Sequence, residues 1–166
     1  MVNFIDHLTH GRSELDLIRD IAPDVPAFRT LAREWFEHSF LREMLKTLSA
    51  RGTTVIVTSD HGSTLARRIC HIRGARGMSH SVRYRFGHSL SADPKNAIIV
   101  HDPEHWGLPD DHPRKGYLFA RDDYLLMQEG MNREDRHKFT GSFQHGGVSL
   151  EEMLVPCDVL RPKKYR

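Results

Sequence analysis

The 166-residue sequence has few cysteines, almost no net charge and no long apolar run. Its two cysteines, Cys70 and Cys157, are too few for a disulfide framework, and we interpret them as reduced thiols of a cytoplasmic protein. The absence of an uncharged apolar stretch of about 18 residues argues against a membrane-spanning helix. A formal net charge of +2 favours no particular class of partner.

Histidine, by contrast, is abundant, with 12 residues in the chain. Apolar residues make up 39% of the sequence, which is too many for a disordered tail and enough for one domain spanning residues 1–166. Because imidazole is both a common metal ligand and a general base, the histidines are the first candidates for a functional site.

Apolar runs and helical periodicity predict an α/β fold. Residues 2–5, 53–58 and 97–100 are short apolar runs typical of strands, and residues 27–48 keep the apolar spacing of a helix. A strand, a helix and a strand in this order form a βαβ unit with a right-handed crossover. We therefore expect a mainly parallel sheet flanked by helices.

The later part of the chain carries weaker signals. Residues 61–92 contain arginines and glycines but no Asp or Glu, and we interpret them as a long mobile loop. Such a loop is either a solvated basic surface or a lip that attracts an anionic substrate; nucleic-acid binding is a weaker alternative. The Ser149 and Glu152 pattern predicts a helix that begins at residue 150, followed by a last strand that ends at Leu160.

Three short motifs combine carboxylates and imidazoles at predicted chain turns. They supply five candidate metal ligands: Asp6, His10, Asp60, His61 and His145. Each motif alone is more often structural, but together they offer a ligand mix suited to zinc or manganese. Five ligands exceed what one open catalytic zinc uses, and they suit two metals about 4 Å apart, as in phosphoryl transfer.

The order of these motifs resembles the alkaline phosphatase superfamily. An Asp-x-x-x-His segment, a strand that ends in Asp-His-Gly and a late His-Gly-Gly look more narrowly like the PglZ-type branch, which occurs as the effector part of response regulators, including those of the type IX secretion system. The resemblance implies two divalent metals, with zinc expected. Asp6, His10 and His145 would hold one, and Asp60 with His61 the second.

The resemblance also bears on substrate and completeness. A stretch around Arg83 and Arg85 is similar to one between the family motifs, and we expect both arginines to bind the anionic substrate. The family takes a further Asp ligand and a Thr or Ser nucleophile from sequence that precedes the first motif. We therefore expect this chain to be the C-terminal portion of a larger alkaline-phosphatase-like domain, inactive alone and with the missing N-terminal half or a second copy as partners.

The leading hypothesis is a metal-dependent phosphodiesterase or phosphatase that acts on an anionic, nucleotide-like substrate within a signalling protein. The alternative is a non-catalytic signalling or interaction module with a structural or vestigial metal site.

Overall fold

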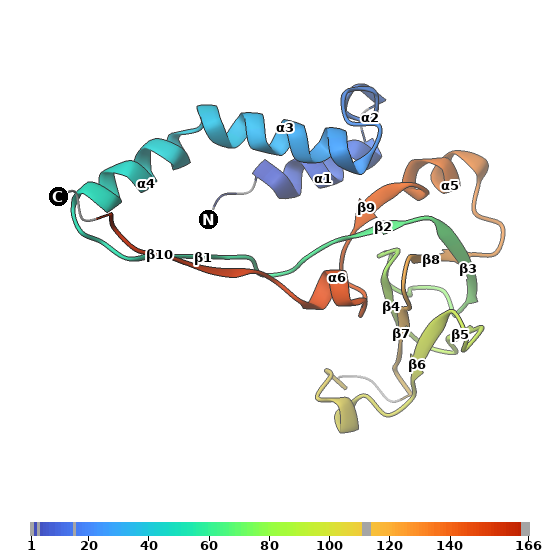
Figure 1. The fold of residues 1–166 in the computed structure, drawn as a ribbon. Coiled ribbons are helices and arrows are strands. Elements are labelled where there is room, and N and C mark those ends of the chain that lie inside the picture. The colour runs from blue at the N-terminus through green and yellow to red at the C-terminus, as the bar shows by residue number, and fades with distance from the viewer. Residues whose placement is uncertain (1, 3, 15, 111–113, 164–166) are drawn as a thin grey trace. The chain divides into compact units, whose positions relative to one another are not determined.

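A computed structural model describes residues 2, 4–14, 16–110 and 114–163, without the side chains of residues 10, 12–14 and 19 (Figure 1). The chain divides into two compact units. Residues 1–60 and 155–166 form the first, which we call the helical unit, and residues 61–154 form the second, the sheet unit. None of the helices among the described residues has the length and apolar character needed to cross a membrane.

Four helices make up most of the helical unit: α1 (Phe4–Glu14), α2 (Asp16–Ile21), α3 (Val25–His38) and α4 (Phe40–Ala50). Asp24 caps α3 by accepting a hydrogen bond from the Ala27 backbone N–H at 2.8 Å. The single helix predicted over residues 27–48 is interrupted at Ser39, whose extended backbone ends α3 and precedes α4. The Ser39 hydroxyl donates to the Phe36 carbonyl at 2.8 Å, which satisfies one of the last carbonyls of α3.

The strand predicted over residues 2–5 is wrong where the structure describes it, because α1 already begins at Phe4. A four-residue apolar run does not distinguish a strand from a helix, and here the side chains of Leu8 and Thr9 are buried on one side of the helix. Asp6 lies in the first turn, where a negative charge interacts favourably with the positive end of the helix dipole. Without that first strand the predicted βαβ unit does not form.

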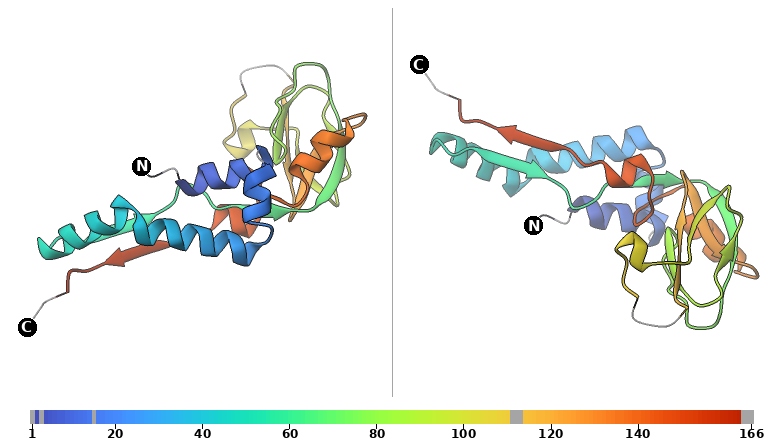
Figure 2. Two further views of the ribbon diagram at one scale, coloured as in Figure 1. Left: turned by 90° about the horizontal axis from the view of Figure 1, so that it is seen from above. Right: turned by 90° about the horizontal axis from the view of Figure 1, so that it is seen from below.

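The strand predicted near residues 53–58 is present as β1 (Val55–Thr58). It pairs antiparallel with β10 (Cys157–Leu160), the predicted last strand, and the two lie side by side in both views of Figure 2. Both strands are largely exposed. Ile56 is 64% exposed and Val159 53% exposed.

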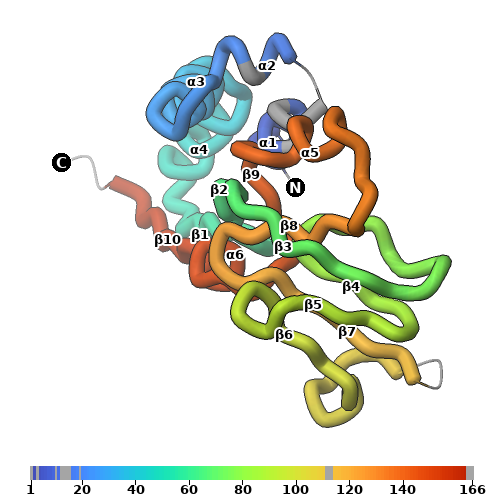
Figure 3. Tube along the Cα trace, turned by 90° about the vertical axis from the view of Figure 1, so that its right-hand side faces the viewer, coloured from blue at the N-terminus to red at the C-terminus, as the bar shows by residue number. Residues whose placement is uncertain are grey.

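The sheet unit contains eight strands among its described residues: β2 (Thr64–Ala66), β3 (Arg68–Arg73), β4 (Tyr84–Gly87), β5 (Ser91–Ala92), β6 (Ala97–Val100), β7 (Gly116–Ala120), β8 (Tyr124–Gln128) and β9 (Ser142–Gln144). They form a β2–β9 ladder and two three-stranded sheets, in the orders β5–β3–β8 and β4–β7–β6 (Figure 3). Three short helices complete it: η1 (Glu104–Trp106), α5 (Arg133–Phe139) and α6 (Leu150–Met153). The predicted helix at residue 150 and the predicted strand over 97–100 are confirmed, whereas the loop predicted over 61–92 carries β2 to β5 and is wrong.

The expectation of a mainly parallel sheet is not confirmed. Five of the six strand pairings among the described residues are antiparallel, and β3–β8 is the parallel one. The coarser assignment to an α/β fold holds, with small sheets in place of one large one.

Two clusters of buried apolar residues form the core of the sheet unit. The larger packs β3 against β6, β7 and β8 and includes Cys70, Ile72 and Leu118; the smaller centres on Leu125 and Met127. The two cysteines differ in environment, since Cys70 is buried in the larger cluster and Cys157 is exposed on β10.

Candidate functional site

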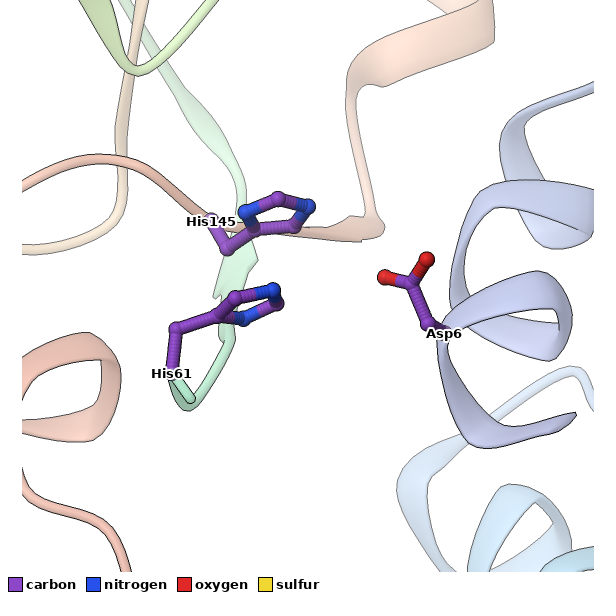
Figure 4. Close-up of side chains that lie close together, drawn as sticks. All are labelled: Asp6, His61 and His145. Carbon is purple, nitrogen blue, oxygen red and sulfur yellow. The ribbon is translucent and has the colours of Figure 1, made fainter. Parts of the chain in front are cut away.

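Two predicted ligands meet within the sheet unit. The imidazole rings of His61 and His145 are stacked, with centroids 3.8 Å apart and planes inclined by 12° (Figure 4). The antiparallel β2–β9 ladder explains this, because it pairs Thr64 with Gln144 and so brings the residues before β2 alongside those after β9. Each ring offers a nitrogen within 4.8 Å of a nitrogen of the other, and both side chains are half-buried.

The backbone next to His61 selects one tautomer. His61 Nδ1 lies 3.0 Å from the Gly62 carbonyl oxygen, a contact that requires Nδ1 to carry the proton and donate. Nε2 of the neutral ring then keeps its lone pair. A metal-ligating histidine commonly uses its other ring N–H in this way, which fixes both ring orientation and basicity.

The glycines after the two histidines are required by close packing. A Cβ on Gly62 would lie 1.9 Å from the Glu151 carbonyl oxygen, closer than real contacts allow. A Cβ on Gly147 would lie 2.7 Å from a Glu152 carboxylate oxygen and 2.8 Å from an Arg83 guanidinium nitrogen. Both glycines therefore let the main chain approach α6 and its neighbours closely.

The structure places Arg83 inside the sheet unit. Arg83 is fully buried and forms a two-point ion pair with Glu152, with Nε–Oε1 at 2.8 Å and Nη2–Oε2 at 2.7 Å. Burial by itself would raise the pKa of Glu152, but the Arg83 hydrogen bonds and charge, together with backbone donors, outweigh it and hold that pKa below its ordinary value.

Arg85 is likewise 4% exposed and donates to the carbonyls of Ser79 and Leu126. Burial lowers the pKa of the Arg85 guanidinium. Both arginines expected to bind substrate thus contact protein groups in the interior, and substrate binding by them stays a prediction from the resemblance. The sequence pattern gave no sign of this, since an arginine on a strand is ordinarily assigned to the surface.

A groove of about 540 Å³ on the sheet unit presents other arginines. It is lined by Thr64, Ile98 and residues 148–151, with Arg68 and Arg121 on its wall beside Asp122 and Asp123. Arg68 is engaged by Asp123 and stacks over the Tyr124 ring at 4.0 Å. Arg121 forms no ion pair among the described residues, so its charge is available to an anion.

The remaining predicted ligands belong to the helical unit. Asp6, the third side chain labelled in Figure 4, is half-buried on α1, and Asp60 is exposed after β1. His10 also lies on α1, but its side chain falls outside the described residues. His61 and His145 are therefore the predicted ligands that the structure brings together within one unit.

A comparison with protein-family models identifies one family along nearly the whole chain. Residues 1–159 match the model described as the BREX system PglZ alkaline phosphatase-like domain. No curated protein matches the chain. The match includes all three motifs that carry the candidate ligands, in the order that suggested the resemblance. On this evidence the chain belongs to the PglZ family of alkaline phosphatase-like domains.

Proposed function

We propose that this chain carries metal ligands of a metal-dependent phosphoester hydrolase, in which His61 and His145 each bind one of two divalent metal ions. The stacked imidazole pair is the observation that carries the proposal. Family membership supports an alkaline phosphatase-like fold, and the histidine pair adds the chemistry.

The geometry of the pair fits two ions better than one. The lone pair of an imidazole nitrogen lies in the ring plane, and zinc binds along it at about 2.0–2.1 Å. Because the two planes are inclined by only 12° with centroids 3.8 Å apart, one ion cannot lie in both planes at bonding distance from both rings. The ring separation is close to the roughly 3.5–4 Å that separates the ions of two-metal phosphoryl-transfer sites.

The other ligands follow from the sequence resemblance and remain predictions. Asp6 and His10 would complete the site of His145, and Asp60 the site of His61, with zinc as the expected metal. When bound, two such ions neutralise charge on the phosphoryl oxygens and activate an oxygen nucleophile. The resemblance assigns the nucleophile itself, a Thr or Ser, to sequence that precedes Asp6.

The chain's own groups would orient the imidazoles and receive the substrate. Donation from His61 Nδ1 to the Gly62 carbonyl leaves Nε2 as the ring nitrogen that can face a metal and fixes its direction. The groove that carries Arg121 suits an anionic phosphoester, because a guanidinium forms charge-assisted hydrogen bonds with phosphate oxygens. A nucleotide-like substrate is the class that the sequence resemblance implies. Action as the effector part of a signalling protein belongs to the same proposal and rests on the sequence resemblance.

Zinc titration of the 166-residue chain tests the metal site. Calorimetry on the wild type should show binding, and His61→Ala and His145→Ala should each weaken it by at least about tenfold. His105→Ala, a change at an exposed histidine of η1, is the control and should leave binding unchanged. Absence of zinc binding, or binding that neither His61→Ala nor His145→Ala affects, contradicts the proposal.

Hydrolysis of a chromogenic phosphodiester separates catalysis from simple metal binding. We expect zinc-dependent turnover by this chain to be slower than about 1 per second, since the expected nucleophile is not among the motifs found here. Turnover at or above this rate that is abolished by His61→Ala would contradict the assignment of the nucleophile to sequence that precedes Asp6.

A further inference from the structure

We propose that Glu152 is the positioning residue of the histidine pair, with its main chain holding the turn after His61 and its side chain holding the turn after His145. An effect of Glu152 on metal affinity rests on the proposed function. The positioning of the two turns by Glu152 does not, because it concerns the protein without metal. Two independent sets of contacts, both within the sheet unit, lead to Glu152.

The first set joins α6 to the turn after His61. The Gly62 backbone N–H donates to the Glu152 carbonyl oxygen at 2.9 Å. The Gly62 carbonyl oxygen in turn accepts a hydrogen bond from His61 Nδ1. The main chain of Glu152 therefore binds the same residue whose carbonyl orients the His61 ring. The 1.9 Å approach of a Cβ on Gly62 to the Glu151 carbonyl shows how closely the two segments pack.

The second set joins the Glu152 carboxylate to the turn after His145. Oε1 accepts from the Gly147 backbone N–H at 2.9 Å, and Oε2 accepts from the Ser149 backbone N–H at 3.1 Å. Ser149 and Glu152 form the capping box of α6. Gly147 is only two residues beyond His145, so the carboxylate fixes the path of the chain that leaves the imidazole.

Arg83 holds this carboxylate in a single orientation. Its two bonds to Glu152 match the planar carboxylate, and its remaining donors reach the carbonyls of Asp122, at 2.7 Å, and Tyr124. A buried ion pair is a weak source of stability compared with apolar packing of the same volume, but arrangements that separate its partners are disfavoured because they leave a buried charge unpaired. The pair therefore specifies where the two turns lie.

The exposure of α6 supports the same role. Leu150 is 71% exposed, Met153 64% and Leu154 70%, whereas Glu152 is 4% exposed. Apolar packing thus contributes little to docking this four-residue helix within the sheet unit, and Glu152 is its buried anchor.

The test compares two matched glutamates in the full chain. Glu152→Gln keeps the shape of the side chain but removes its charge and one acceptor. Glu129→Gln is the control, because Glu129 forms a similar two-point pair with Arg73, at 3.0 and 2.9 Å, but on the exposed surface of the same unit. Both variants are examined without metal by nuclear Overhauser contacts between the His61 and His145 rings, and then by zinc titration.

Glu152→Gln should lose the ring-to-ring contacts and bind zinc about 10–100-fold more weakly, the range found for residues that orient metal ligands. Glu129→Gln should match the wild type in both measurements. Intact ring contacts and unchanged zinc affinity in a folded Glu152→Gln would overturn the proposal. If the wild type binds no zinc but its ring contacts depend on Glu152, the proposed function fails and the positioning role stands.

Arg83→Lys decides the matter if Glu152→Gln does not fold. Lysine keeps the positive charge but replaces the two-point contact with a single ammonium, so the carboxylate is no longer fixed in orientation. Ring contacts that persist unchanged in Arg83→Lys would contradict the proposal, and their loss in a folded protein would support it.

Discussion

The helical unit and the sheet unit are stabilised in different ways. In the sheet unit, alternate strand residues enter two buried apolar clusters. Among the described residues of the helical unit only Leu8, Thr9 and Ala22 are buried, and neither α3 nor α4 contains a buried residue. The interactions of the helical unit include helix caps, neighbouring charge pairs such as Arg33–Glu37 at 2.8 Å, the stacked rings of Phe4 and Trp35, and the β1–β10 ladder. The comparison teaches that a buried apolar core distinguishes the sheet unit, whereas the described residues of the helical unit bury few side chains.

The largest expected effect is the loss of a core leucine from the sheet unit. Leu118 is fully buried, and Leu118→Ala should lower the free energy of unfolding by about 2–5 kcal/mol through lost burial and a cavity. Leu17 is 66% exposed on α2, and Leu17→Ala should change the free energy of unfolding by less than about 0.5 kcal/mol. Urea unfolding monitored through backbone amide signals of each unit measures both values; similar losses would remove the distinction between the units.

Two glycine substitutions, one in each unit, should change stability by intermediate amounts and in opposite directions. Gly62→Ala forces a methyl group against the Glu151 carbonyl and should destabilise the sheet unit by about 1–3 kcal/mol. Gly11 lies on α1 with only an ordinary contact, 3.5 Å to Ile18, so Gly11→Ala should stabilise the helical unit by about 0.5–1 kcal/mol. Thermal unfolding of the two variants measures the two stability changes. Changes of the same sign in both variants would contradict the prediction.

The smallest expected effect is a pH dependence specific to the sheet unit. The pKa of Glu152 is held below its ordinary value in the folded state, so its stabilising contribution is present above about pH 4.3, the unfolded value, and is lost as pH falls through the lower folded pKa. The stability difference between wild type and Glu152→Gln should therefore shrink on acidification. Chemical unfolding at neutral pH and below about pH 4 measures it, and a difference that is constant or grows towards acid would contradict the assignment.

Part of the fold followed from the sequence because its signals are local. The strand over 97–100, the helix after Ser149 and the last strand depend on short-range pattern and capping, and all three are confirmed. The strand β3 was detectable but missed. Cys70 and Ile72 alternate with the exposed His71 and Arg73, which is the period of a half-buried strand.

Other features depend on partners distant in the chain. The pairing of β1 with β10 joins residues about a hundred positions apart and makes the ladder antiparallel, which no local pattern specifies. The same holds for Arg83, whose burial is explained only by Glu152, 69 positions away. At the candidate site, the motifs identified His61 and His145, whereas the contribution of Glu152 beyond the capping box could not be predicted because it arises from tertiary contacts.

The different surroundings of the two cysteines give each unit its own chemical reporter. Cys157 is exposed on β10 of the helical unit, so a thiol reagent should modify it in the native protein without any opening of the fold. Cys70 is buried in the core of the sheet unit, and burial also raises the pKa of its thiol, which reduces the reactive thiolate. Its modification therefore waits for the core to open, so that the rate of alkylation at Cys70 follows the opening equilibrium of the sheet unit in an otherwise unaltered chain.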